Sequence, residues 1–266
     1  MHRRLTPLRA AWRLLRLALQ VCYGLLVMAL RFPALDAAGR QARIGRWSAG
    51  VLRAMGVQLR ISGTPRPGAT LLLANHVSWL DIAALHAAVP QARFVAKADL
   101  LHWPVLGWLV QGAGTLFIER ERKRDALRVV HAVADALSAG QTVAVFPEGT
   151  TGTGPVLLPF HANLLQAAIA TSTPVQPAVL RFADAQHRFS PAVAFVGTTT
   201  LLQSLWRVAS AQGLVVQVDL LPPQASAHAD RRALAEALRQ LMADQLGTET
   251  CAAGPARRPT GQTPDP

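Results

Sequence analysis

The sequence predicts an α/β domain with a mixed, mostly parallel sheet flanked by helices, preceded by a basic, apolar two-helix hairpin that contacts a membrane. Two observations carry this prediction. From residue 57 onward, short apolar runs of strand length alternate with longer segments of helical periodicity, which is typical of α/β domains. The first 60 residues instead carry eleven arginines, no lysine and one acidic residue, Asp36, interleaved with long apolar runs.

Composition limits the class of protein. The chain has 266 residues, of which 51% are hydrophobic and 16% charged, and its net charge is +12. This length fits one large domain with appendages. Two isolated cysteines without a Cys-x-x-Cys pair favour neither a disulfide framework nor a zinc site. The basic N-terminal block lacks a nucleic-acid-binding signature, so we expect it to meet an anionic membrane surface and no nucleic acid.

The predicted hairpin consists of helices over residues 5–31 and 36–56, separated by Phe32-Pro33. The smooth apolar run 17–30 lies between Arg16 and Arg31, and it is shorter than the ~20 residues that a bilayer span needs. Three interpretations of this first helix compete: a secretory signal peptide, a packed core helix and an anchor in the cytoplasmic leaflet. We favour the anchor, because a second basic helix suits a hairpin seated on anionic lipid.

The remaining elements follow in order along the chain. We expect strands over residues 57–61, 70–74, 93–97, 115–118, 142–146, 175–181, 192–196 and 214–220. We expect helices over 79–88, 104–112, 121–139, 162–171, 201–211 and 230–246. Residues 248–266 are rich in Ala, Gly, Pro, Thr and Arg, which predicts a disordered tail. The chain therefore divides into a hairpin, 1–56, an α/β domain, 57–247, and the tail.

The stretch 70–81, TLLLANHVSWLD, reads as a strand, a turn and the start of a helix. It places His76 five residues before Asp81. If the turn folds back, the Asp81 carboxylate accepts a hydrogen bond from one ring nitrogen and leaves the other free as a base. The alternative interpretation is a capping box over Ser78-x-x-Asp81, in which Asp81 only satisfies helix N–H groups.

Two further strand ends carry polar groups. In 142–150, TVAVFPEGT, the strand runs into a Pro-Glu-Gly turn that presents Glu148 beside exposed backbone N–H groups, although an ordinary surface turn explains it too. In 114–120, GTLFIER, the strand ends on Arg120, which can clamp a phosphate or carboxylate, or pair with Glu119 or Glu121.

Together and in this order, these stretches resemble the glycerolipid acyltransferase family, over roughly residues 55–200. The family's blocks match Asn75, His76 and Asp81; Gly114, Phe117 and Arg120; Phe146, Pro147, Glu148, Gly149 and Thr150; and Pro174, Val175 and Pro177. Lys97 with Pro104 is similar to the family's lysine-containing segment between the first two blocks.

The resemblance implies a mechanism. His76 takes a proton from the free hydroxyl of a lysolipid, Asp81 holds the imidazole, and the hydroxyl oxygen attacks the thioester of acyl-CoA or acyl carrier protein. Arg120 binds the acceptor head group, Glu148 positions it, and the N–H groups near Gly149 and Thr150 hold an oxyanion or phosphate. It implies no metal and no dissociable cofactor. The absence of a Gly-x-Ser-x-Gly elbow agrees with direct transfer.

Two departures from the family pattern bear on the acceptor. Thr151 stands where many members carry Arg, and His161 stands where many carry Lys after Phe160. We expect 1-acylglycerol-3-phosphate as the acceptor, with lyso-ornithine lipid as the alternative, at the cytoplasmic face of the inner or plasma membrane. A transacylase and a non-catalytic lipid-binding protein are the competing hypotheses.

Residues 100–110, LLHWPVLGWLV, carry Trp103 and Trp108 around a proline and a glycine. The segment predicts a buried helix, a wall of the acyl-chain groove, or a second membrane contact with interfacial tryptophans. His86 carries no assignment from the sequence.

Overall fold

The computed structural model describes residues 7–103, 105–118 and 123–247. Its strands are β1 (Gln58–Ser62), β2 (Thr70–Ala74), β3 (Arg93–Lys97), β4 (Leu116–Ile118), β5 (Thr142–Val145), β6 (Val175–Ala183) and β7 (Val215–Leu220). The helices are α1 (Pro7–Leu30), α2 (Ala37–Ala54), α3 (Leu80–Ala88), α4 (Leu106–Gly112), α5 (Lys123–Ser138), α6 (Leu165–Ala170), α7 (Leu201–Ser210) and α8 (Arg231–Leu246). Short 3-10 turns are η1 (Phe32–Ala34), η2 (Ala98–His102) and η3 (Ala162–Leu164).

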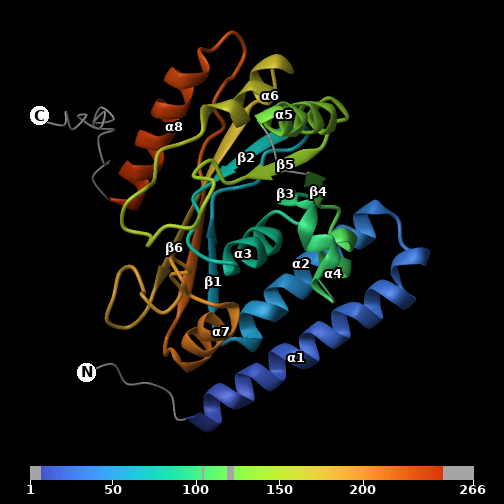
Figure 1. Cartoon of the computed structure of the whole chain (residues 1–266), viewed down its shortest axis with the longest axis vertical. Coiled ribbons are helices and arrows are strands. Elements are labelled where there is room, and N and C mark those ends of the chain that lie inside the picture. Colours follow the sequence, from blue (N-terminus) through green and yellow to red (C-terminus); the bar gives the residue numbers. More distant parts are fainter. Residues whose placement is uncertain (1–6, 104, 119–122, 248–266) are drawn as a thin grey trace, which may run out of the picture.

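The strands form one mixed sheet in the order β1-β7-β6-β2-β5-β3-β4 (Figure 1). The five strands from β6 to β4 all pair in parallel, and the antiparallel β6–β7 pairing reverses the direction of β7 and β1. The predicted mixed, mostly parallel sheet is confirmed. The central strand β2 is buried along its whole length, which explains its unbroken apolar run.

Helices cover both faces of the sheet (Figure 1). Because side chains alternate along a strand, Leu72 and Ala74 of β2 face the helices α2, α3 and α7, whereas Leu71 and Leu73 face α5, α6 and α8. The molecule therefore has three layers with two separate apolar cores. The helix α1 lies outside this arrangement, along α2 and α7, and only two of its residues are buried.

Both N-terminal helices are held against the α/β body. Asp36 caps α2 by accepting a hydrogen bond from the Gly39 N–H, and α2 packs its buried face on α3. The helices α1 and α2 exchange two hydrogen bonds between Gln20 and Trp47, each from a side chain to a backbone carbonyl. That both helices sit on lipid as a hairpin stays a prediction. The domain boundaries at 56 and 247 stay predictions too.

Two expected elements differ from the sequence prediction. The strand over 192–196 is wrong: residues 192 and 193 lie in a turn and 194–196 are irregular. Two contacts join the segment to the site, because the Phe195 N–H donates to the Val77 carbonyl and the Phe195 carbonyl accepts from the Thr151 hydroxyl. The helix over 162–171 is divided into η3 and α6, so only its second part is α-helical. The other described boundaries agree to within two residues, the usual uncertainty of helix and strand ends.

Candidate active site

The carboxyl ends of neighbouring parallel strands bring the predicted blocks together. His76 follows β2, and Phe146 to Thr150 follow β5, the adjacent strand in the sheet. Lys97 ends β3, and the third block runs along β4 beyond it. In an open α/β sheet, ligands bind in the crevice outside these strand ends. Topology therefore brings segments that are 70 or more residues apart in the sequence to one edge of the sheet.

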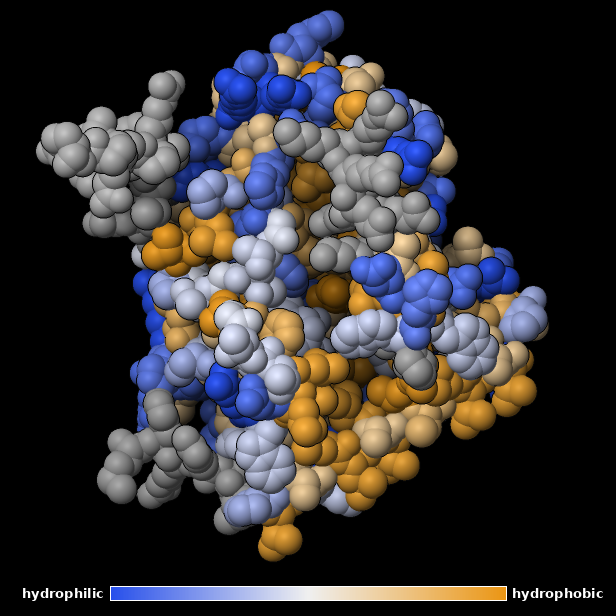
Figure 2. All heavy atoms as spheres, in the orientation of Figure 1, coloured by the Kyte–Doolittle hydropathy of each residue, from blue (hydrophilic) through white to orange (hydrophobic). Residues whose placement is uncertain are grey.

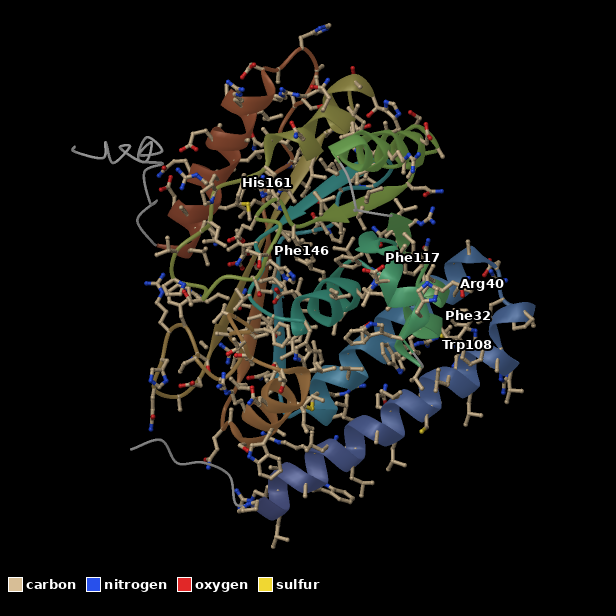
Figure 3. All side chains as sticks on the ribbon, viewed as in Figure 1. Phe32, Arg40, Trp108, Phe117, Phe146 and His161 are labelled. Carbon is tan, nitrogen blue, oxygen red and sulfur yellow. The ribbon has the colours of Figure 1, made fainter. Side chains whose placement is uncertain are left out.

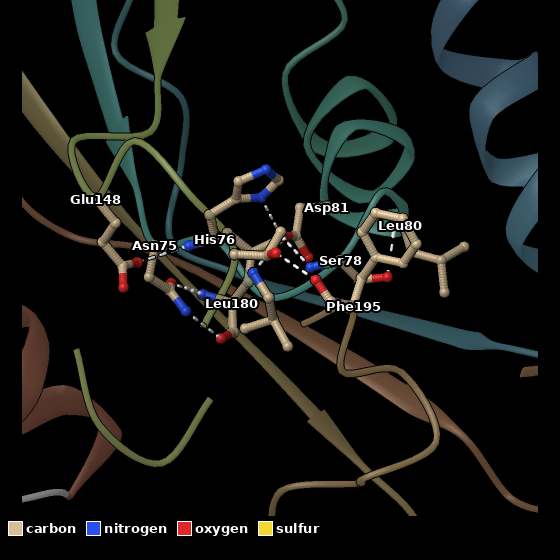
Figure 4. Close-up of polar contacts among 10 residues, drawn as sticks. Asn75, His76, Ser78, Leu80, Asp81, Glu148, Leu180 and Phe195 are labelled. Atoms are coloured by element: carbon tan, nitrogen blue, oxygen red, sulfur yellow. Dashed lines mark hydrogen bonds and ion pairs between the residues drawn. The ribbon is translucent and has the colours of Figure 1, made fainter. Parts of the chain in front are cut away.

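His76 and Asp81 form the hydrogen bond that their spacing predicts (Figure 4). The Nδ1 atom of His76 lies 2.8 Å from Oδ2 of Asp81. The side chain of Asp81 is fully buried, whereas that of His76 is 19% exposed. Among the described residues, no group is hydrogen bonded to the His76 Nε2 atom. This nitrogen is thus free to accept a proton from a substrate.

The same Asp81 oxygen also receives two backbone N–H groups. Val77 N and Ser78 N donate to Oδ2 at 2.6 and 2.8 Å. The second of these is the contact that the Asp81 side chain makes to the Ser78 N–H in a capping box. The two interpretations of Asp81 therefore coexist in one carboxylate. Its other oxygen, Oδ1, is buried and has no hydrogen-bond partner among the described residues. Three donors converging on Oδ2 fix the carboxylate and, through it, the plane of the imidazole.

A row of aromatic rings supports the imidazole from one side. Phe146 stacks on His76 with ring centroids 4.0 Å apart and an interplanar angle of 14°. Phe94 stacks on Phe146 at 5.8 Å, and His86 meets Phe94 edge-on at 4.7 Å. These contacts immobilise the His76 ring by packing. Figure 3 labels Phe146, which follows β5, and Phe117, which lies on β4, two strands away in the sheet.

Glu148 is turned into the protein. Its Oε1 accepts the His76 N–H at 2.8 Å (Figure 4), and its Oε2 accepts the Leu158 N–H at 2.9 Å. The residue is 5% exposed. Burial raises the pKa of Glu148 to about 7, against the opposing effect of the two backbone hydrogen bonds. The carboxylate thus ties the turn between His76 and Asp81 to the segment after β5.

That segment is joined to the site at several other points. The Gly152 N–H donates to the His76 carbonyl at 2.7 Å, and the His161 N–H donates to the Pro147 carbonyl at 2.8 Å. The Thr151 hydroxyl donates to the Phe195 carbonyl. The loop 151–161 is therefore fixed beside His76 at both of its ends and at Leu158.

The remaining motif residues differ in what they offer a ligand. Asn75 is buried, and its amide both donates to and accepts from the Leu180 backbone, at 2.9 and 2.7 Å. The Gly149 N–H donates to the Phe146 carbonyl in the turn. Among the described residues no acceptor is assigned to the N–H of Thr150, whose side chain is exposed. Of the two predicted backbone donors, Thr150 is the one left for a ligand.

Gly149 has φ +70°, a left-handed conformation that favours glycine. A Cβ atom there would lie 3.0 Å from the His161 ring, so the imidazole of His161 lies directly over this turn. His161 thus places an imidazole against the Phe-Pro-Glu-Gly-Thr turn, at the position where many members of the family carry a lysine. Figure 3 shows it near Phe146.

Several predicted residues are only partly placed. Arg120, Pro104 and the tail lie outside the described residues, as does the side chain of Lys97, whose backbone ends β3. Gly114 precedes β4 with φ +75°, and its carbonyl accepts the Arg93 Nε–H at 2.6 Å. Across the part of the chain that the structure describes, no cluster of three His, Cys, Asp or Glu residues has the arrangement of a metal site.

Sequence reasoning missed Phe94, His86 and the Leu158 N–H as neighbours of the catalytic turn. Phe94 and His86 lie in elements that were predicted, but no spacing rule relates a strand residue to a ring two strands away. The Leu158 contact depends on the path of an irregular loop. The one signal for it in the sequence is the acidic Glu148 between Pro147 and Gly149, which the family resemblance assigns to the substrate.

Comparisons with known proteins show which family the chain is similar to. The family model described as Acyltransferase matches residues 58–181. The chain is 40% identical over 205 residues to a 1-acyl-sn-glycerol-3-phosphate acyltransferase of Neisseria meningitidis, covering 73% of this chain and 78% of that one. It is 35% identical over 216 residues to a lyso-ornithine lipid O-acyltransferase of Pseudomonas aeruginosa, covering 79% and 81%.

A solved structure shares the fold. The crystal structure of the 1-acyl-sn-glycerophosphate acyltransferase from Thermotoga maritima superposes with a TM-score of 0.63 at 18% identity, covering 88% of this chain and 96% of that chain. At this identity the likeness concerns the fold alone.

Proposed function

The chain belongs to the glycerolipid acyltransferase family and is a lysophospholipid O-acyltransferase, and on that premise we propose that His76 is its general base and 1-acylglycerol-3-phosphate its acceptor. The observation that carries the proposal is the 2.8 Å contact of Asp81 with His76 Nδ1, which leaves Nε2 free at the carboxyl edge of the sheet.

The reaction needs no covalent enzyme intermediate. His76 Nε2 takes the proton of the acceptor hydroxyl as its oxygen attacks the thioester carbonyl carbon of acyl-CoA or acyl carrier protein. The carbon–sulfur bond then breaks, the new ester forms, and the thiolate leaves with the proton from the imidazolium. The buried Asp81 carboxylate stabilises the imidazolium between these two steps. The N–H of Thr150 is positioned to hold the oxyanion.

Glu148 and Asn75 act as positioning residues in this proposal. Both side chains use their polar atoms on backbone groups of the protein, so neither is available to a head group. Arg120 and Lys97 would supply the positive charge for the acceptor's phosphate.

The alternative acceptor, lyso-ornithine lipid, is favoured by one feature of the site. His161 over Gly149 replaces the fixed positive charge of a lysine with an imidazole, and Thr151 is engaged with Phe195. A phosphate monoester gains less from this arrangement than from two cations. A relative named as a lyso-ornithine lipid acyltransferase is 35% identical to this chain.

We also propose that the enzyme lies on one leaflet of the membrane, at its cytoplasmic face. Seven residues of α1 form one exposed stripe: Leu8, Trp12, Leu15, Leu19, Tyr23, Leu26 and Leu30. Figure 2 shows apolar side chains gathered over the region where Figure 1 places α1. Surrounding arginines suit anionic lipid.

Among the described residues, α1 is the one helix with the length and composition to cross a bilayer. Its neighbours argue against crossing. Near its start, Arg13 donates to the carbonyls of Ala209 and Ala211 at the end of α7, and near its end, Met28 packs on Gly112 of α4. A helix held to the protein body along its length lies in the interface plane.

The test is acyl transfer by the membrane-bound protein from labelled acyl-CoA or acyl carrier protein. 1-Acylglycerol-3-phosphate and lyso-ornithine lipid are offered separately, with His76→Ala as the control. We expect product from the first acceptor, lost in the variant. Product from lyso-ornithine lipid alone would reassign the acceptor. Product that persists in His76→Ala would remove His76 from the mechanism, and turnover without any thioester would indicate a transacylase.

A further inference from the structure

A cavity of about 320 Å³ lies between α1, α2 and α4, away from the catalytic edge. Gly24 and Val27 line it from α1, Ile44 and Ser48 from α2, and Leu109 from α4. Its volume falls in the range of sites for small ligands. None of the motif residues around His76 lines it, so it is distinct from the candidate active site.

Two buried polar atoms at the cavity lack a partner. Ser48 and His86 both line it, and they are 1% and 5% exposed. Within the described residues, neither the Ser48 hydroxyl nor the His86 Nδ1 has a hydrogen-bond partner. Burial also lowers the pKa of His86 to about 4, so its ring is neutral. Unsatisfied buried polar atoms cost free energy, and a polar group in the cavity would satisfy them.

The cavity also carries positive charge and little to balance it. Arg43, Arg46 and Arg53 of α2 all line it. In the described parts of the chain, none of the three forms an ion pair, and the nearest acidic residue in sequence is Asp36 at the far end of α2. An anion is therefore the complementary ligand.

The opening of the cavity meets the apolar stripe of α1. Tyr23 lines the cavity and is also a member of that stripe, with half of its surface exposed. Figure 3 labels Phe32, which lines the cavity from η1, where the chain turns from α1 to α2. A ligand that reaches the cavity past Tyr23 comes from the side of the molecule that carries the exposed apolar residues.

Three ring contacts in a row lie between the cavity and His76. His86 touches Phe94, Phe94 stacks on Phe146, and Phe146 stacks on His76. A molecule in the cavity contacts the first ring of this row and not the reacting imidazole. The cavity is thus a second site on the membrane side of the molecule.

We propose that this cavity binds one single-chain anionic phospholipid taken from the membrane. Its phosphate lies on Arg43 and Arg46, its glycerol or ester oxygens reach Ser48 and His86, and its chain packs on Val27, Met28 and Leu109. A fatty acid shares the charge and the chain but lacks the oxygens for the two unpartnered atoms. The site is independent of acyl transfer, so its failure leaves the role of His76 untouched.

The test uses Trp47, which lines the cavity. A lysophosphatidic acid brominated on its chain is titrated into the detergent-solubilised full chain, and tryptophan quenching is compared with that of Trp47→Phe. A brominated fatty acid and a brominated lysophosphatidylcholine serve as the other two probes. Native mass spectrometry counts the bound molecules in both proteins, which keeps the test valid if the variant is less stable.

The matched variants are Arg43→Gln with Arg46→Gln, and Arg16→Gln with Arg31→Gln, which remove the same charge outside the cavity. We expect saturable, Trp47-dependent quenching by lysophosphatidic acid. The first pair of substitutions should weaken the affinity for this lipid roughly tenfold or more, and the second pair should change it little. The zwitterionic probe should bind correspondingly more weakly. Equal weakening by both pairs would mean general attraction to a basic surface and overturn the site. Quenching without a Trp47 component, or equal affinity for the fatty acid, would overturn the assigned occupant.

Discussion

Replacing Asp81 by Asn separates the two functions of this carboxylate. An asparagine oxygen in the place of Oδ2 still accepts hydrogen bonds from Val77 N, Ser78 N and the His76 Nδ1–H. The amide NH2 then occupies the place of Oδ1, which is buried and has no partner among the described residues. The turn and the tautomer of His76 are kept, while the negative charge is lost.

The expected loss of activity follows from that charge. At a separation of about 4 Å and an effective dielectric constant of about 20, a carboxylate stabilises an imidazolium by about 4 kcal/mol. Removing it slows acyl transfer by roughly a thousandfold. The unpartnered NH2 lowers the free energy of unfolding by about 1–3 kcal/mol. Asp81→Ala removes the acceptor of all three N–H groups and should destabilise the protein further, with a similar loss of activity.

The assay measures initial rates of label transfer from acyl-CoA to the lysolipid, with thermal unfolding recorded in the same detergent. If Asp81 serves only as a helix cap, Asp81→Asn keeps near-normal activity because the cap is intact. A folded Asp81→Asn protein with a rate within about fivefold of the wild type would refute the role of Asp81 in catalysis.

Three other predictions follow from the structure. Burial raises the pKa of Glu148 to about 7 from 4.5, so its contribution to stability is complete below pH ~4.5 and is lost as pH rises through 7. Glu148→Gln should therefore remove about 3 kcal/mol of pH dependence from the free energy of unfolding, measured by denaturant titration at pH 5 and 8. An unchanged pH dependence in the variant would contradict this assignment to Glu148. His161→Lys should raise the rate with 1-acylglycerol-3-phosphate relative to lyso-ornithine lipid by roughly tenfold, measured as a ratio of kcat/KM values, and a ratio that does not move would remove His161 from head-group selection. Leu19→Glu with Leu26→Glu removes two exposed apolar side chains worth about 2 kcal/mol each at a membrane; binding to anionic vesicles should fall by roughly a hundredfold or more in a sedimentation assay, whereas Leu127→Glu on α5, 64% exposed, should have no effect.

The contrast between His76 and Glu148 shows how far the sequence reaches into the site. The His76–Asp81 contact was predictable, because both residues belong to one turn and their spacing constrains the geometry. The orientation of Glu148 was not, because one of the two N–H groups that donate to it, that of Leu158, depends on the path of the loop 151–161. The predicted strand over 192–196 failed because a run of apolar residues, of which only Val193 is buried, does not by itself form a strand ladder.

The sequence by itself determined the α/β class, the strand ends that carry the motif blocks and the chemistry of an oriented imidazole. These properties are local, because periodicity, turn residues and short spacings act within a few residues of the chain. Only the tertiary structure decided that Phe94 and Phe146 support the imidazole, that Glu148 holds the backbone, and that α1 and α2 enclose a cavity ending at Ser48 and His86. Such contacts join residues on different strands and helices, and their positions depend on how the packed elements fit against one another.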